Sequence, residues 1–350
     1  MKREPGIKSD KSLLAVLDGS TTPRPPIWFM RQAGRYLPEY REVRAKAGGF
    51  VELCLNPEMA AEVTLQPVRR FDLDAAIIFS DILIVPHALG VDLWFEENEG
   101  PRLAPVNDRE TFKSMADVLD RGITARVYEA IATARATLPT NVALIGFCGA
   151  PWTVATYLIA GRGTENQAPA KNLMHADAKL FGEIIDRLTE ATALHLIGQV
   201  DAGAEVVQIF DTWAGSLDAA NYERWCVAPT AKIVEAVRTA KPQAKVIVFP
   251  KGVSLDGTAR LVEACSADAV SLDQFVDRND ARARLEGTCA LQGNLAPETL
   301  LAGGEALDRE VDQILDDFSG ASYIFNLGHG ILKETPIAHV ERMLTRVRGQ

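Results

Sequence analysis

Arginine is concentrated in one short stretch near the N-terminus. Between positions 24 and 46 there are six basic and two acidic residues, a balance of +4 within a chain whose formal net charge is −10. The basic ones are Arg24, Arg31, Arg35, Arg41, Arg44 and Lys46. Guanidinium groups grip carboxylates and phosphates through paired hydrogen bonds, so the cluster predicts a ligand with several anionic groups. Gly34, between Arg31 and Arg35, lets backbone N–H groups approach that ligand. Arg41 and Arg44 fit a solvated basic loop as well as they fit a binding site.

A single carboxylate, Asp81, stands inside the apolar stretch IIFSDILI at positions 77–84. A carboxylate at the edge of a core is costly unless something partners it. Three roles are open: a structural ion pair with an arginine, a general acid with a raised pKa, or an anion that stabilises positive charge on a ligand. Desolvation would raise its pKa and nearby guanidinium groups would lower it. We expect Arg31 and Arg35 to prevail and to keep Asp81 ionised.

Other side chains have weaker claims to chemistry. Tyr157 lies where a loop enters a helix, and is either a phenolic donor or part of the core. His329 is bracketed by glycines at the end of an apolar run and is predicted to be functional. His195 lies on the apolar face of a helical pattern, which is typical of a packed core histidine. Lys251 follows another apolar run and could form a Schiff base. The other histidines show no metal-ligand spacing, and there is no GxSxG for serine catalysis, so we expect no metal site.

Eight short apolar runs provide the elements that position these residues. They lie at 27–30, 74–79, 142–147, 206–210, 246–249, 269–272, 289–292 and 323–325. Few of them alternate apolar with polar residues, which is typical of parallel strands buried on both faces. Helical patterns fall between them at 178–200, 222–239, 258–264 and 304–318, with a small strand excursion at 91–95 and 101–103. Strand and helix repeated eight times predict a closed (β/α)₈ TIM barrel.

An open doubly wound sheet is the alternative fold. It would place a GxGxxG turn after its first strand, but residues 30–35 read MRQAGR. Neither an internal repeat nor a low-complexity linker divides the chain. We therefore expect residues 1–350 to form a single barrel domain with its core over about 20–348.

In such a barrel the active site lies on loops that leave the C-terminal ends of the strands. Polar residues and glycines gather at those positions in this sequence. They are Arg31, Arg35, Ser80, Asp81, Cys148, Gly149, Asp211, Thr212, Lys251, Asp273, Gly293, Asn294, Gly328, His329 and Gly330.

Composition excludes several other classes of protein. Hydrophobic residues make up 47% and charged residues 24%, as in an ordinary globular chain rather than a disordered or membrane-embedded one. The 47 acidic residues outnumber the 37 basic ones, which argues against binding nucleic acid or an anionic membrane over a broad surface. Five cysteines, none of them in a CxxC, indicate neither a disulfide framework nor a zinc site. The N-terminal residues show no secretion signal, so we expect a cytoplasmic protein.

Two stretches resemble the motifs of the uroporphyrinogen decarboxylase family. Residues 26–41 read PIWFMRQAGRYLPEYR and match its N-terminal motif closely, and GFCGAPWT at 146–153 resembles its second motif. Residues 77–90, DTWAG at 211–215, QGNL at 292–295 and NLGHG at 326–330 fit as well. The matches extend in order from residue 26 to 331, which makes the resemblance specific.

This resemblance implies a (β/α)₈ barrel enzyme of tetrapyrrole (haem) biosynthesis, usually a homodimer, that needs no metal or organic cofactor. Its substrate would be uroporphyrinogen III, which carries four acetate and four propionate arms. The four acetates lose CO₂ and become methyl groups, giving coproporphyrinogen III. The motifs place substrate-binding residues at Arg31, Gln32, Ala33, Gly34, Arg35, Asp81, Tyr157, Thr212 and His329. Asp81 and Arg31 would be catalytic, and Thr212 stands where the family often has serine. Tyr40 and Arg44 would line the mouth of the pocket.

The mechanism expected from this resemblance begins with protonation of the ring carbon that bears an acetate arm. The pyrrole then carries the positive charge and serves as its own electron sink. An ionised Asp81 would stabilise that charge and accept hydrogen bonds from the pyrrole N–H groups. Arg31 is placed to deliver the proton but is a poor acid, so a water or a substrate carboxyl is the alternative.

Three other functions compete with this one. Zinc-dependent methyltransferases of the same superfamily use a His-x-Cys pair, which this sequence lacks. A Schiff-base lyase would use Lys251, and a carrier would bind a tetrapyrrole without releasing CO₂.

Overall fold

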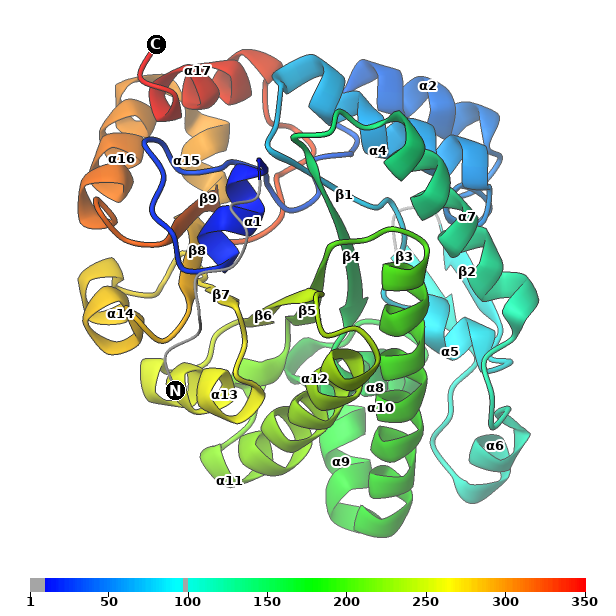
Figure 1. Cartoon of the computed structure of the whole chain (residues 1–350). Helices are drawn as coiled ribbons and strands as arrows, with labels where there is room; N and C mark the ends of the chain where they lie inside the picture. The colour runs from blue at the N-terminus through cyan, green and yellow to red at the C-terminus, as the bar shows by residue number, and fades with distance from the viewer. Residues whose placement is uncertain (1–9, 97–99) are drawn as a thin grey trace.

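A curled parallel sheet forms the centre of the molecule (Figure 1). The computed structural model describes residues 10–96 and 100–350, and within them the sheet has seven strands in the order β1-β4-β5-β6-β7-β8-β9. They are β1 Ala75–Ile77, β4 Ala143–Gly149, β5 Val206–Asp211, β6 Lys245–Pro250, β7 Ala269–Ser271, β8 Ala290–Leu295 and β9 Tyr323–Leu327. Every neighbouring pair is parallel. Seven of the eight predicted strands are therefore confirmed, in a mixed α/β fold.

The helices lie around this sheet, most of them on its outer face. Those that precede β4 are α1 Ser12–Leu17, α2 Pro38–Lys46, α3 Phe50–Cys54, α4 Pro57–Phe71, α5 Ile84–Ala88, α6 Arg109–Ser114 and α7 Arg121–Thr137. Between β4 and β6 come α8 Pro151–Ala160, α9 Ala168–Ala176, α10 Ala178–Asp201, α11 Ala219–Tyr222 and α12 Ala228–Ala240. The rest are α13 Leu255–Cys265, α14 Arg278–Leu285, α15 Pro297–Ala302, α16 Gly304–Asp317 and α17 Ile337–Val347. Short 3₁₀ turns lie at Glu165–Gln167 and Ala214–Ser216. A π-helical turn, Glu223–Val227, joins α11 to α12, so the helix predicted at 222–239 is interrupted near its start.

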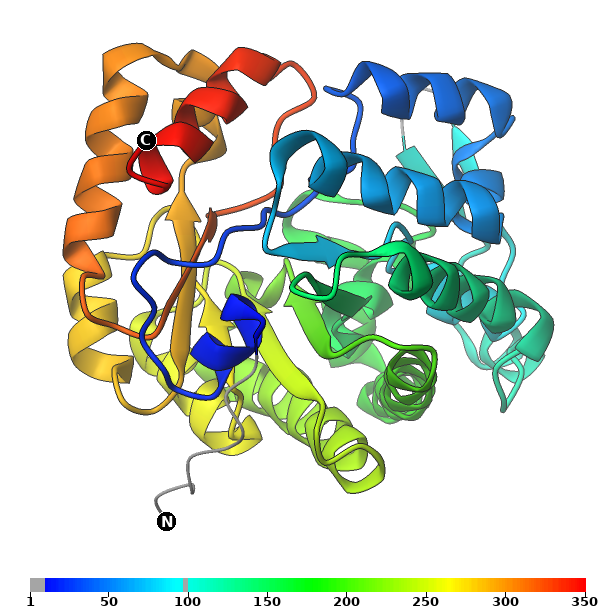
Figure 2. The same cartoon turned by 45° about the horizontal axis from the view of Figure 1, so that its top comes forward.

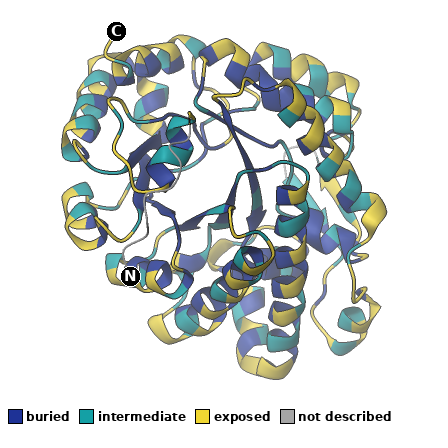
Figure 3. Cartoon of the chain, in the orientation of Figure 1, coloured by how far each residue is buried: buried dark blue, intermediate teal, exposed yellow. Residues whose placement is uncertain are grey.

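The small excursion predicted after the second apolar run is an antiparallel pair. Strand β2 (Leu93–Glu96) pairs with β3 (Gly100–Leu103), separate from the main sheet. The strands of the main sheet, by contrast, are buried along their lengths, as Figure 3 shows. None of the helices in the described part of the chain combines the length and apolar character needed to cross a membrane.

The predicted first strand, 27–30, is reduced to one parallel bridge between Ile27 and Phe325 of β9. Figures 1 and 2 show this blue segment running between β9 and β1. The Phe325 N–H donates to the Pro26 carbonyl (2.9 Å), and the Asp74 N–H donates to the Ile27 carbonyl (3.0 Å). A longer ladder does not form because Pro26 has no N–H and because the Ile27 N–H bonds to the Asp74 carboxylate (2.9 Å) instead.

One end of the curled sheet is closed by helix α1. Leu13, Val16 and Leu17 are buried among side chains that point inside the curl, including Trp28 and Phe249. Polar contacts fix the helix to residues that precede β1 and β5: Ser12 donates to Asp74 (3.1 Å), and Lys11 pairs with Glu205. Because α1 covers the end where the strands begin, the opposite end, where they finish, is the one left for a site.

Candidate active site

Arg31 lies at the mouth of the curled sheet beside the loop that follows β9. Its backbone is left-handed (φ 62°), which ends the extended segment and turns the chain toward α2. The side chain packs on Gly330: a Cβ placed there would lie 2.5 Å from its Cδ and 2.8 Å from its Cγ. The guanidinium charge lowers the pKa values of Asp81, Tyr157 and His329, so Arg31 lies within electrostatic range of all three.

Asp81 occupies the turn between β1 and α5. Its Oδ1 accepts a hydrogen bond from the Leu83 N–H (2.8 Å), and its apolar neighbours include Phe50 and Ile84. Burial raises the pKa of Asp81, and neither the Leu83 N–H nor the Arg31 charge offsets that effect. The prediction that two arginines would hold this pKa down is therefore wrong. Of the two arginines, Arg31 is the one whose charge acts on Asp81, whereas the charge of Arg35 acts on Tyr40.

Tyr157 projects from α8 into the same region. Burial raises the pKa of its phenol, the negative charge of Asp81 raises it further, and a hydrogen bond with the Trp213 side chain and the charge of Arg31 lower it. Of the two roles left open for Tyr157, this neighbourhood favours the phenolic donor over simple packing, since both charged residues of the predicted site act on it.

His329 follows β9 and completes the group around Arg31. Burial lowers the pKa of His329 to about 4, and the charges of Arg31 and Lys251 lower it as well, so the imidazole is neutral at neutral pH. Its Nδ1 is buried and has no hydrogen-bond partner among residues 10–96 and 100–350. A buried ring nitrogen without a partner is unusual and is available to a ligand. His195, by contrast, is 3% exposed inside α10 and 3.2 Å from the Tyr128 hydroxyl, as expected of a core histidine.

Gln32, predicted to bind substrate, is turned into the protein. It is fully buried, accepts from the Phe29 N–H (3.2 Å) and donates to the Ala75 carbonyl (3.1 Å). The side-chain amide therefore ties the segment after Pro26 to β1. Its neighbours Ala33 and Gly34 are half-buried, and the Arg35 carbonyl accepts from Arg41 (2.9 Å). Of this predicted binding stretch, the structure places the Arg31 side chain beside Asp81 and gives Gln32 a supporting position.

Tyr40 and Arg44 form a wall near Asp81. The Arg44 guanidinium lies 5.6 Å from the centre of the Phe50 ring, and the Tyr40 ring lies 5.5 Å from that of Phe79. Burial raises the pKa of Tyr40 to about 12.

Thr212, after β5, borders a separate cavity at the same end of the sheet, where the strands finish. This cavity of about 290 Å³ is also lined by Trp213, Ser216, Lys251, Gly252 and Phe275, among others. Asp81 and Arg31 are not among its lining residues.

Asp211, the residue before Thr212, was placed at a strand end by the sequence but was given no role there. It is 4% exposed and accepts a hydrogen bond from Thr153 (2.6 Å), whose hydroxyl in turn accepts from the Trp213 N–H (3.1 Å). Burial raises the pKa of Asp211 to about 6. The signal in the sequence was the same as for Asp81, a carboxylate directly after an apolar strand.

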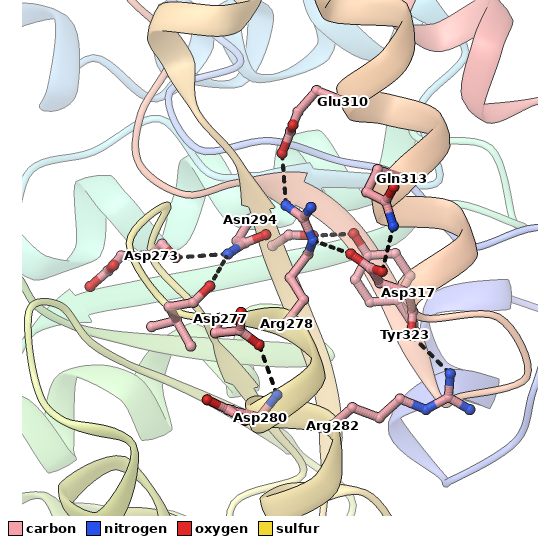
Figure 4. A network of polar contacts seen from close by, with 12 residues as sticks. Asp273, Asp277, Arg278, Asp280, Arg282, Asn294, Glu310, Gln313, Asp317 and Tyr323 are labelled. Carbon is pink, nitrogen blue, oxygen red and sulfur yellow. Dashed lines mark hydrogen bonds and ion pairs between the residues drawn. The ribbon is translucent and has the colours of Figure 1, made fainter.

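A polar network supports the rim behind β7 and β8 (Figure 4). The Asn294 side chain donates to the carbonyls of Asp273 and Val276, both at 3.0 Å. The Asp273 carboxylate accepts from the backbone N–H groups of Gly252 (2.6 Å) and Phe275 (2.9 Å). Asn294, predicted at a strand end, therefore fixes the loops around the cavity.

Comparison with known proteins agrees with this geometry. The family model described as "Uroporphyrinogen decarboxylase (URO-D)" matches residues 8–350. The chain belongs to the uroporphyrinogen decarboxylase family. A relative from Sphingopyxis alaskensis named uroporphyrinogen decarboxylase is 51% identical over 342 residues, which cover 97% of this chain and 99% of the relative. One of the same name from Chelativorans sp. is 51% identical over 340 residues, covering 97% and 98%.

Among solved structures, the fold of this family member is similar to that of a methyltransferase from Methanosarcina mazei. The TM-score is 0.77 at 19% identity, covering 97% of this chain and 98% of the other. A likeness at this identity concerns the fold alone. The part of the chain that the structure describes contains no group of three or more His, Cys, Asp or Glu side chains arranged to hold a metal ion.

Proposed function

We propose that this protein removes the four acetate carboxyls of uroporphyrinogen III as CO₂ and produces coproporphyrinogen III in haem biosynthesis. The observation that carries the proposal is the desolvated carboxylate of Asp81 at the end of β1, within electrostatic range of Arg31 and Tyr157. Membership of the uroporphyrinogen decarboxylase family supports the same conclusion.

Substrate binding follows from the charges at the rim. Arg31 and Arg35 take carboxylate arms, for which guanidinium groups offer paired donors. Asp81 accepts from the inward-pointing pyrrole N–H groups at the centre of the macrocycle. Tyr157, Thr212 and the neutral His329 provide further hydrogen bonds, while Ala33 and Gly34 present backbone to the ligand. Gln32 holds this stretch in place from behind.

The reaction begins with a proton that adds to the α-carbon next to the ring carbon bearing an acetate arm. Protonation of the acetate-bearing carbon itself would make that carbon tetrahedral, and it could then form no double bond to the methylene. The cationic pyrrole draws electrons from the breaking C–C bond, CO₂ leaves, and a neutral ring with an exocyclic methylene remains. A second proton converts the methylene to methyl, and the ring carbon then loses the first proton, which restores the aromatic pyrrole. Each decarboxylation therefore consumes one proton in total. The ring supplies the electron sink, so the step requires no cofactor. A nearby positive charge relieves the cost of burying the Asp81 carboxylate, and the pyrrole carries such a charge only after it is protonated. The attraction between Asp81 and the ring is therefore strongest in the protonated intermediate, which it stabilises.

The proton comes from a water molecule or a substrate carboxyl. Arg31 retains its proton near neutrality. His329 has a pKa of about 4 and is unprotonated at that pH, so it orients a ligand rather than supplying a proton.

The proposal includes the architecture around the site. The chain forms one domain, of which residues 1–9 and 97–99 lie outside the described residues. The segment around Ile27 takes the eighth strand position and closes the barrel between β9 and β1. The backbone bonds of Phe325 to Pro26 and of Asp74 to Ile27 support this closure. We also propose that the protein is a homodimer and is cytoplasmic. Sedimentation of the purified protein, at the concentrations used in activity assays, would test the dimer.

The decisive experiment is anaerobic incubation with uroporphyrinogen III followed by counting the carboxyl groups of the product. A tetracarboxylate product with four equivalents of CO₂ is expected. Uptake of the porphyrinogen without CO₂ release would identify a carrier and contradict the proposal. Borohydride trapping of a Lys251 adduct would instead favour the Schiff-base alternative.

A further inference from the structure

Lys251 projects from the end of β6 into the cavity that Thr212 also borders. It is half-buried, and its ammonium group makes no ion pair or side-chain hydrogen bond within residues 10–96 and 100–350. The chain therefore holds a cation inside a hollow without using it to stabilise the fold. A cation in a hollow without a protein partner is available to an anion from outside.

The backbone of Lys251 is held rigidly. Its N–H donates to the Asp211 carbonyl (3.2 Å), and its carbonyl accepts from the Gly215 N–H (3.0 Å). Gly215 permits this close approach, since a Cβ there would lie 2.2 Å from the Gly252 carbonyl oxygen. The next residue, Gly252, is left-handed (φ 74°) and donates to the Asp273 carboxylate. A lysine on so fixed a support points its charge at a defined position.

The charges near this hollow favour an anionic occupant. Lys251 and Arg31 both act on His329, which stays neutral, so two cations border the same part of the mouth. Asp273 is the acidic residue among those that line the cavity, and both of its oxygens accept from backbone N–H groups. The Ser216 hydroxyl, another lining group, is buried without a partner in the described chain and can donate to an anion.

The position of Lys251 in the sheet determines which part of the substrate it meets. Strand β6 is three strands from β1 in the sheet order, roughly 14 Å along the curled surface at about 4.8 Å per strand. If Asp81 takes the centre of the macrocycle, a group across the opening faces its periphery. The peripheral carboxylates that persist through all four decarboxylations are those of the propionate arms.

We propose that Lys251, with Ser216 beside it, binds a propionate carboxylate of the tetrapyrrole and sets the orientation of the ring over Asp81. This inference rests on the proposed function and adds a specificity residue to it. A lysine amine could form a Schiff base only with a carbonyl carbon, and the porphyrinogen offers carboxylates and pyrroles. The role assigned here is therefore electrostatic and involves no covalent step.

The test is binding of the reaction product, coproporphyrinogen III, which keeps propionates but has lost every acetate. Equilibrium dialysis under anaerobic conditions compares the full-length protein with Lys251→Met, Lys251→Arg and Lys232→Met. Lys232 lies exposed on α12 and controls for the loss of one positive charge. In Lys251→Met we expect the Kd to rise about tenfold, the lower end of what a hydrogen bond to a charged group contributes, because the cavity is open to solvent. Lys251→Arg should retain most of the affinity, and Lys232→Met should match the wild type.

Kinetics with uroporphyrinogen provide the second measurement. We expect Lys251→Met to raise KM by the same factor as the product Kd, with kcat nearly unchanged. An unchanged product Kd overturns the inference, and so does a fall in kcat without weaker product binding, which would place Lys251 at the reacting acetate. Lys251→Gln replaces the methionine variant if the latter does not fold. Product binding needs no turnover, so it tests Lys251 even if absence of CO₂ release refutes the proposed function.

Discussion

Replacing Asp81 by asparagine separates the charge of this side chain from its shape. Asparagine has nearly the same volume, and its carbonyl oxygen can still accept the hydrogen bond that the Leu83 N–H donates to Asp81 at 2.8 Å. It can likewise accept from a pyrrole N–H. The substitution removes the negative charge, which is the property to which we assign stabilisation of the transition state.

The expected loss follows from Coulomb's law. A carboxylate about 4 Å from the cationic pyrrole, at an effective dielectric constant of about 20, interacts with it by roughly 4 kcal/mol. Since every 1.36 kcal/mol is a factor of ten, kcat should fall about a thousandfold. Removing one preorganised stabilising group from other enzymes typically costs about 10² to 10³ in kcat, which agrees. Substrate affinity should change little.

The stability of the variant provides an internal check. The folded pKa of Asp81 is raised above its unfolded value, so the stability linked to this group is complete below the unfolded pKa and is lost as pH rises through the folded pKa. Ionisation of this carboxylate therefore destabilises the empty enzyme. Asp81→Asn should unfold at the same urea concentration as the wild type or at a higher one.

The assay is anaerobic turnover of uroporphyrinogen with kcat and KM measured separately, alongside urea unfolding. The matched control is Asp72→Asn, which removes the same charge from an exposed, left-handed position (φ 50°) before β1. Asparagine tolerates that conformation, so the control should keep full activity. Unimpaired kcat in Asp81→Asn, or an equal loss in both variants, would refute the electrostatic role.

Three further outcomes are expected. Gly330→Ala inserts a methyl group 2.5 Å from the Arg31 Cδ, and should lower kcat/KM at least tenfold with little change in unfolding temperature, as CO₂ release and calorimetry would show. Gln32→Ala leaves a buried N–H and a carbonyl unpaired, at about 1–3 kcal/mol each, so urea unfolding should show a large loss of stability; a purely kinetic defect would contradict the supporting role. Asp211 has a folded pKa of about 6 against an ordinary 3.8, so its ionisation costs about 3 kcal/mol as pH rises from 4 to 8. Relative to the wild type, Asp211→Asn should gain that stability over this range, and a pH-independent difference would argue against the raised pKa.

The regular part of the fold could be predicted from sequence because burial on both faces leaves a local signature. Runs such as 206–210 and 246–249 are continuously apolar, and the structure has β5 and β6 there. The segment 27–30 carries the same signature but forms a single bridge. Its hydrogen bonding is decided by Pro26 and by a distant carboxylate, that of Asp74, which takes the Ile27 N–H.

The candidate site, like the fold, could be predicted only in part from the sequence. The sequence by itself indicated that Arg31, Asp81 and His329 stand at strand ends. In the structure the charge of Arg31 acts on Asp81, on His329 and on Tyr157 of α8. Only the tertiary structure decided in which direction the pKa of Asp81 shifts, because desolvation comes from apolar groups such as Phe50 that lie far away along the chain. It also decided that Gln32 points inward and that the ammonium group of Lys251 has no partner in the described chain. Strand ends are encoded locally, whereas burial and pairing depend on which distant segments pack together.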